Sequence, residues 1–216
     1  MKFLPSLRTP ALTACALLLL AAPAFAASDP LSAVIDAQVA VRKSDTNAFN
    51  AAVDVDTLLN KGLDDSLAVL CERASNGTLP PMEPMLAMAV AGIASDCRPE
   101  NPQLLVLRGL FQSEAKTFIS TGISGGYFAG QPNGKVTETS MHTRLLKGMS
   151  TARKDLVPGS VISQTADTAE VSATLQDGDA GAFPLRLKVD RKNASWRITE
   201  VLNARELIQD ALSRRQ

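Results

Sequence analysis

The chain has 216 residues, and its 22 Lys and Arg are balanced by 22 Asp and Glu. This balance excludes the strongly basic surface on which binding to nucleic acid or to an anionic membrane depends. The sequence contains neither an internal repeat nor a low-complexity tract.

The first 26 residues have the form of a bacterial export signal. Lys2 and Arg8 give a basic start, an apolar run of 11 residues covers 12–22, and Ala24-Phe25-Ala26 provides the small residues of a cleavage site. The run is too short to span a membrane, which takes about 20 residues. Cys15 precedes most of the run, and this order disfavours a lipoprotein signal. We therefore expect a cleaved signal peptide over 1–26.

Cleavage would leave a mature chain over 27–216, with 190 residues, 20 basic and 22 acidic side chains. That length suits a single domain. No second apolar stretch reaches membrane length. We expect a soluble periplasmic protein, with secretion as the alternative.

Cys71 and Cys97 are the cysteines of the expected mature chain. Two thiols in an exported protein most often form a disulfide. The bond would close a loop with 25 intervening residues, to which the chain-entropy model assigns about 3.5 kcal/mol. The alternative is two buried thiols on helices too far apart to be linked. We expect the disulfide.

Helical patterns dominate residues 27–154. Asp29 followed by Pro30 predicts the start of a helix, and apolar residues then recur at helical spacing up to Lys43. Ser44-Asp45 ends this helix. Further helices are expected around Phe49, from Asp54 or Asp56 to Asn76, over 85–97, from Asn101-Pro102 to Gly122, and around Met141, Leu145 and Met149.

Residues 122–134 differ from their surroundings. They hold five glycines, a proline, and the aromatic pair Tyr127-Phe128. Glycine-rich backbone loses much freedom on ordering, which predicts a loop. Exposed aromatic rings on such a loop can close over a ligand or dock a partner, whereas the alternative is that they pack back and fix the loop. We take Tyr127 and Phe128 as the candidate recognition residues.

After residue 154 the apolar period changes to two, which is typical of half-buried strands. The alternation is clear over 169–176 and 183–190, and 157–165 and 195–202 are plausible flanking strands. Pro184 cannot donate to a sheet, which favours an edge or an end of its strand. Asn203 and Glu206 predict a capped closing helix. The fold class is therefore α+β: a helical N-terminal layer (27–154) packed on a C-terminal four-stranded antiparallel meander with a closing helix (155–216).

Three patterns resemble functional motifs. Residues 122–126 match G-x-S-x-G, but a nucleophile elbow needs a strand before the serine, and a helix is expected there. His142, the only histidine, lacks other ligands at metal-binding spacing. Met82, Met85 and Met88 could hold Cu(I) through their thioethers, although core packing is the simpler explanation. We expect no catalytic residue, no cofactor and no metal.

The C-terminal strands resemble a known superfamily. Residues 183–190, a polar turn and Trp196-Arg197-Ile198 are similar to the closing strands of nuclear-transport-factor-2-like domains, and residues 30–60 resemble exported bacterial members. The resemblance implies a cystatin-like α+β fold whose curved sheet wraps a helix and forms a cone with a pocket. Enzymes of this superfamily place acids, histidine or tyrosine inside the cone. Here the inward positions of the clear strands are Ala, Val, Leu and Phe, so no catalytic residue is carried over.

We expect a non-catalytic exported protein that binds a small apolar ligand or an envelope partner protein. The alternatives are an enzyme whose acid and base come from the helical half, and a copper-handling protein that uses Met82, Met85 and Met88. Carboxylates, histidine or tyrosine around a cavity would favour the enzyme, and three convergent sulfur atoms would favour copper. A dry apolar cavity favours binding.

Mass spectrometry of the exported protein checks the leader and the cysteines together. We expect a mature N-terminus at Ala27 and one cross-linked peptide that joins Cys71 to Cys97 without reductant. A start at Cys15 with added lipid mass would contradict the cleavage, and quantitative alkylation of both thiols without reductant would contradict the disulfide.

Overall fold

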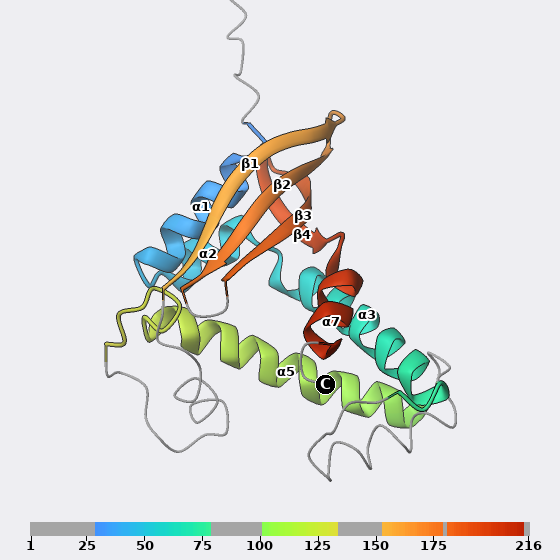
Figure 1. Ribbon diagram of the computed structural model, residues 1–216. Helices are drawn as coiled ribbons and strands as arrows, with labels where there is room; N and C mark the ends of the chain where they lie inside the picture. The colour runs from blue at the N-terminus through green and yellow to red at the C-terminus, as the bar shows by residue number, and fades with distance from the viewer. Residues whose placement is uncertain (1–28, 79–100, 134–152, 179–180, 214–216) are drawn as a thin grey trace, which may run out of the picture.

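Helices precede a four-stranded sheet in the computed structural model, which describes residues 29–78, 101–133, 153–178 and 181–213 (Figure 1). The expected segments 1–26 and 85–97, the helix around Met141, and the side chains of Cys97 and His142 lie outside the described residues. The described elements are α1 (Ser32–Arg42), α2 (Thr46–Ala52), α3 (Val55–Ser75), α5 (Pro102–Ser124), β1 (Lys154–Gln164), β2 (Thr168–Asp177), β3 (Gly181–Lys192), β4 (Ser195–Val201) and α7 (Ala204–Ser213).

The sheet is an antiparallel meander in the order β1-β2-β3-β4, which confirms the predicted fold class. β2 and β3 pair without interruption from Thr168↔Asp190 to Asp177↔Gly181. β1 begins at Lys154, three residues before the predicted strand, and its pairing with β2 shifts register between Pro158 and Ser163. Such register shifts are typical of β-bulges near a sheet edge.

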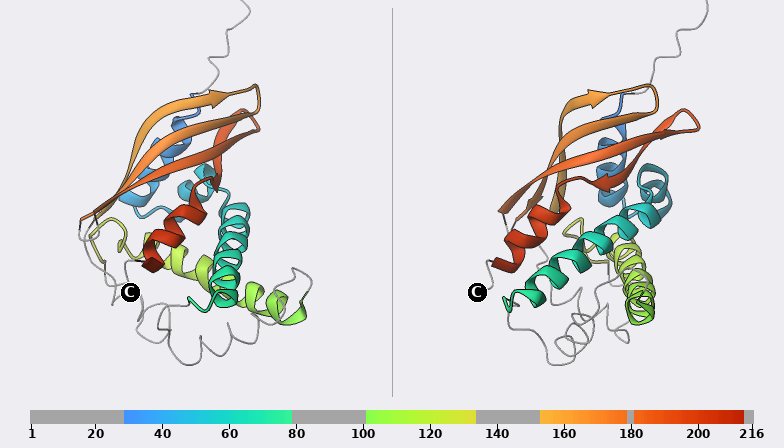
Figure 2. Two further views of the ribbon diagram at one scale, coloured as in Figure 1. Left: turned by 45° about the vertical axis from the view of Figure 1, so that its right-hand side comes forward. Right: turned by 90° about the vertical axis from the view of Figure 1, so that its right-hand side faces the viewer.

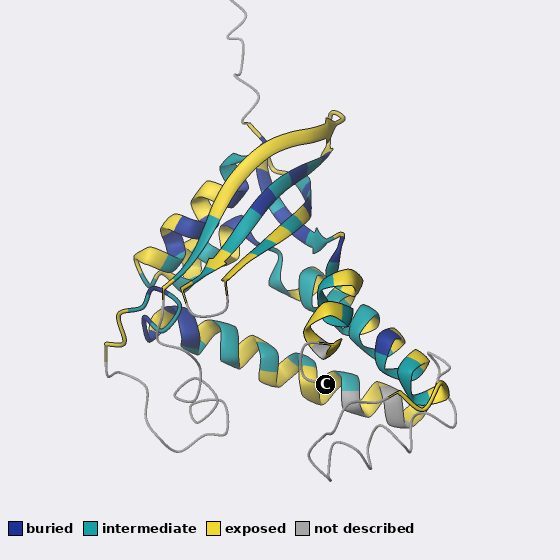
Figure 3. Cartoon of the chain, viewed as in Figure 1, coloured by how far each residue is buried: buried dark blue, intermediate teal, exposed yellow. Residues whose placement is uncertain are grey.

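The core lies between one face of the sheet and α1 and α2 (Figure 3). The predicted inward positions of β2 and β3 are buried near the centre of the sheet, and Trp196 of β4 is 3% exposed. The apolar residues on this face therefore hold the helices onto the sheet, as their period of two predicts. The buried cluster comprises Ala33, Val34, Ala37, Ala52, Val53, Ala169, Val171, Ala173, Leu187, Val189, Trp196 and Ile198.

The helical half does not cover the sheet as one layer. α1 and α2 pack on the sheet, whereas α3 leaves it at the edge strand β4, where Val53 forms a parallel bridge with Ile198. α5 and α7 pack on α3 beyond the end of the sheet (Figures 1 and 2). The expected helical layer on the sheet therefore consists of α1, α2 and the start of α3, whose Val55 and Leu58 pack against the core.

Aspartate side chains cap α2 and α3, whereas α1 begins without a side-chain cap. The Asp45 carboxylate accepts a hydrogen bond from the backbone N–H of Ala48 at 2.9 Å, and Asp54 accepts one from Thr57 at 3.3 Å. Asp54, rather than Asp56, therefore caps α3. These bonds satisfy backbone donors that have no partner inside the helix.

Asn203 does not cap α7 with its side chain, in contrast to the sequence prediction. Its side-chain oxygen accepts from the N–H of Arg186 at 2.9 Å, and its amide donates to the carbonyl of Pro184 at 2.9 Å. β4 pairs only with Leu187–Lys192 of β3, so Pro184 and Arg186 have β2 on one side and no strand on the other. The buried Asn203 side chain replaces the missing strand, because a side-chain amide carries the same donor and acceptor as backbone. Pro184 lies at this open side, as its missing N–H predicts.

Candidate functional site

A cavity of about 260 Å³ lies where α1 and α2 meet the ends of β1 and β2. Aliphatic and aromatic side chains line it, and Lys154 and Gln38 are the polar residues on its wall. Sites for drug-sized ligands typically measure roughly 300–1,000 Å³, so this cavity suits a small molecule. Its lining residues are Ala37, Gln38, Val41, Phe49, Phe128, Lys154, Leu156 and Leu175.

The polar ends of Lys154 and Gln38 bond to other residues of the protein. The Lys154 ammonium pairs with the Asp177 carboxylate at 2.7 Å, and both side chains are 14% exposed. The Gln38 oxygen accepts from the N–H of Leu156 at 2.5 Å, and its amide donates to Asp155 at 2.6 Å. Both residues therefore present mainly their aliphatic stems to the cavity, whose surface is apolar.

The Asp155 carboxylate joins the two walls of the cavity. It accepts hydrogen bonds from Gln38 and Arg42 of α1 and from Arg153, which precedes β1. Partial burial raises the pKa of Asp155, but the hydrogen bonds and positive charges of Arg153 and Arg42 outweigh it, so the pKa lies below its ordinary value. The anionic form thus holds α1 against β1.

Phe128 lines the cavity and is anchored by α5. Its ring lies 5.8 Å from that of Phe118, centroid to centroid. A Cβ added at Gly122 would overlap the Phe128 ring, so glycine at this helical position makes room for the aromatic side chain. The Phe128 carbonyl accepts from the N–H of Lys154 at 3.0 Å, which ties the turn to β1.

The glycine-rich segment is therefore shorter and more structured than the sequence predicts. α5 continues to Ser124, and hydrogen-bonded turns follow, such as that from the N–H of Gln131 to the carbonyl of Gly126. Phe128 packs back into the molecule, as in the alternative interpretation of this loop, yet it also lines the cavity. Tyr127 is half-buried and is not among the lining residues. Phe128 is selected from the sequence as a residue of an exposed loop, whereas the structure places it on the wall of the cavity.

A second, larger cavity of about 520 Å³ lies between the start of α3, the end of α5 and β4. Charged side chains on its wall pair with one another: Lys116 with Asp56 at 2.6 Å, and Arg197 with Asp54 at 3.6 Å. Arg197 also donates to the carbonyls of Asn50 and Val53, at 2.8 and 3.2 Å. Arg197 therefore connects β4 to the junction of α2 and α3, which is a structural role.

The other candidate residues do not assemble into a catalytic or metal site in the described part of the chain. Ser124 ends a helix, and its hydroxyl donates to the carbonyl of Ser120, so the strand that a nucleophile elbow needs does not precede it. Cys71 is half-buried on α3, and its expected partner lies outside the described residues, as do Met82, Met85 and Met88. Over the described ranges, His, Cys, Asp and Glu form no cluster that could hold a metal ion.

Among the residues that line the cavity, only Phe128 is identified from the sequence as a candidate site residue. Gln38 and Lys154 belong to elements whose patterns indicate a buried stripe and a strand end, and neither residue has a pattern of its own that marks a site. The signal that could have found Gln38 is a polar residue on the buried side of an otherwise apolar helix, where it is 7% exposed.

Comparisons of the chain with protein-family models, curated proteins and solved structures give no match. Among the described helices, none is both long and apolar enough to cross a membrane.

Two glycines of α5 give a matched test of the Phe128 anchor. Gly122→Ala should destabilise the protein by about 1–3 kcal/mol, because the added methyl group overlaps the ring. Gly109→Ala should stabilise it by about 0.5–1 kcal/mol, because nothing lies within 4 Å of the new Cβ and alanine favours a helix. Urea unfolding measures both, and equal effects of the two substitutions would show that the ring does not pack on Gly122.

The Asp155 cluster predicts a dependence of stability on pH. Because the pKa is lower in the folded protein, the carboxylate stabilises the fold above the unfolded-state pKa, which is about 4. This stabilisation disappears as the pH falls through the folded-state pKa. Asp155→Asn should cost about 2 kcal/mol at pH 7 and progressively less below pH 4.

The control for this experiment is Asp36→Asn, at an exposed position of α1. Urea unfolding from pH 7 to pH 2 should show a pH-dependent difference from wild type only for Asp155→Asn. A difference that stays constant over this range would mean that the Asp155 charge does not stabilise the fold.

Proposed function

We propose that this protein is a non-catalytic binding protein for a small apolar ligand, held in the cavity between α1, α2, β1 and β2. The apolar lining of that cavity is the observation that supports the proposal. Burial of apolar ligand surface contributes roughly 25 cal/mol per Å², so a small hydrocarbon group gains useful affinity without a directional contact.

The arrangement of polar groups favours binding over catalysis. A general base or nucleophile has to reach the substrate with a lone pair or proton to exchange. The polar ends of Gln38 and Lys154 instead bond to Leu156, Asp155 and Asp177. The larger cavity is lined by ion pairs that brace the fold, and we assign it no ligand.

We further propose that the protein acts after export, in the periplasm, with a disulfide between Cys71 and Cys97. This part rests on the basic start, apolar run and small-residue cleavage pattern of residues 1–26. Membership in the nuclear-transport-factor-2-like superfamily also remains a proposal, supported by the strand pattern that ends at Trp196-Arg197-Ile198.

The ligand site can be tested with uncharged probes and a substitution that fills the cavity. Wild-type protein should bind 1-octanol or naphthalene in calorimetric titrations. Val41→Phe places a larger side chain on the cavity wall and should weaken binding by at least roughly tenfold, which corresponds to about 1.4 kcal/mol.

Val39→Phe is the matched control, because Val39 lies on the same helix, is 39% exposed and does not line the cavity. It should bind the probes as wild type does. If wild-type protein binds neither probe, the proposed function is refuted. If both substitutions weaken binding equally, the binding site lies elsewhere.

A further inference from the structure

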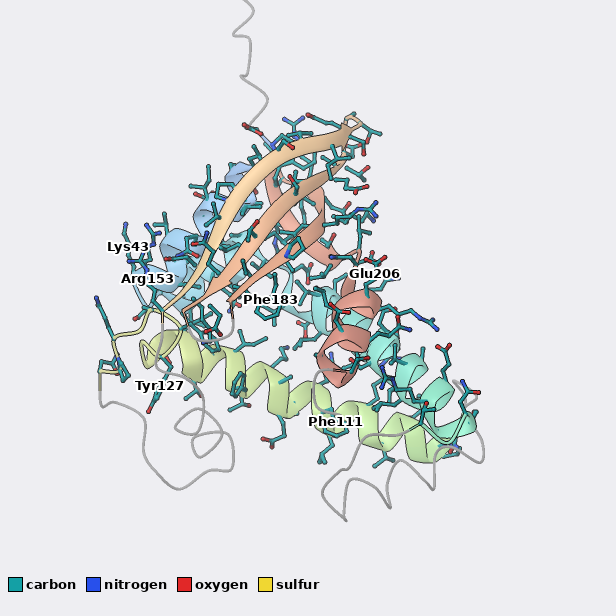
Figure 4. All side chains as sticks on the ribbon, in the orientation of Figure 1. Lys43, Phe111, Tyr127, Arg153, Phe183 and Glu206 are labelled. Carbon is teal, nitrogen blue, oxygen red and sulfur yellow. The ribbon has the colours of Figure 1, made fainter. Side chains whose placement is uncertain are left out.

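Three cations that are next in sequence to lining residues of the apolar cavity point to the chemical class of its ligand. Arg42 and Lys43 directly follow the lining residue Val41, and Arg153 directly precedes the lining residue Lys154. Lys43 and Arg153 lie at the end of the molecule that also carries Tyr127 (Figure 4). We call Arg42, Lys43 and Arg153 the cationic rim, because all three are next to the cavity wall in sequence.

Among the described residues, the rim carries more positive than negative charge. Asp155 accepts from both Arg42 and Arg153, so one carboxylate balances two guanidinium groups. Asp45 follows Lys43 by two positions, and its carboxylate accepts from the N–H of Ala48 as the cap of α2. Among the described residues Lys43 has no carboxylate partner. Lys154 and Asp177 neutralise each other. In the described part of the chain, the three cations Arg42, Lys43 and Arg153 thus outnumber the two anions Asp45 and Asp155.

We propose that the ligand is a small single-chain amphiphile with an anionic head group, such as a carboxylate, whose apolar chain lies in the cavity and whose head lies at the cationic rim. This inference rests on the proposed function. The apolar interior cannot compensate the cost of burying a charged head, because the polar ends of its wall residues already have partners within the chain. A head at the rim stays hydrated and is attracted by the surplus positive charge.

Three probes with the same chain length separate the contribution of the head from that of the chain. Octanoate, 1-octanol and octyltrimethylammonium are titrated calorimetrically into the purified protein at low ionic strength. Octanoate should bind roughly 1.5-fold to fivefold more tightly than 1-octanol, the range that an exposed charge pair supplies. Octyltrimethylammonium should bind most weakly, and added salt should reduce the differences.

A charge reversal at the rim provides a second test of the anionic head group. Lys43→Glu should abolish the advantage of octanoate and leave 1-octanol binding unchanged, whereas Lys61→Glu, at an exposed position of α3, should change neither. Neither substitution removes an ion pair that the described residues form, so both variants should fold.

The outcomes distinguish this inference from the proposed function. If 1-octanol does not bind at all, the proposed function fails and this inference falls with it. If 1-octanol binds but octanoate binds no better than octyltrimethylammonium, the cavity is a ligand site and the anionic head is wrong. Flotation of the protein with phosphatidylglycerol vesicles, without binding of free octanoate, would also overturn the inference, because the rim would then recognise a membrane surface.

Discussion

The attachment of α1 to the edge strand β1 through Gln38 is the constraint on which the rest of the molecule depends. A buried amide has to satisfy its donors and its acceptor, and Gln38 does so only with α1 placed against Asp155 and Leu156. That placement fixes the distance between helix and strand, and the cavity occupies the space that remains. The apolar core stabilises the packing of α1 on the sheet, but apolar contacts are non-directional, and the directional bonds of Gln38 select one position.

The amino-acid sequence predicts the strands and most helices because their periodicity is strong. The alternation around Val171 and Leu187 identifies the buried face of the sheet, and Asp54 starts α3 as one of the two expected caps. The candidate site is harder to predict, because its wall brings together α1, α2, a turn and two strand ends. Gln38 and Asp155 are 117 positions apart in the chain, and no local pattern relates them.

Asn203 shows why a local pattern can give the wrong partner. An asparagine before a helix, followed by Glu206, is the pattern of a capping box, but backbone groups of β3 compete for the same side chain. The N–H of Arg186 and the carbonyl of Pro184 point to the side that β4 does not reach, and a buried backbone group without a partner costs about 1–3 kcal/mol. The free N–H groups in the first turn of an exposed helix can bond to water instead. The Asn203 side chain therefore bonds to the backbone of β3 rather than capping α7.

The edge strand β1 has a consequence for how the protein behaves among other chains. Residues 157–164 are exposed, and they include Val157, Val161 and Ile162, an apolar composition that would suit pairing with a foreign strand. Pro158 offers no N–H, and the register shifts between Pro158 and Ser163 break the regular row of donors and acceptors. Irregular edges of this kind are a recognised defence against edge-to-edge aggregation. The same irregularity that disrupts the β1–β2 ladder therefore protects the protein at high concentration, since a growing fibril needs an uninterrupted template.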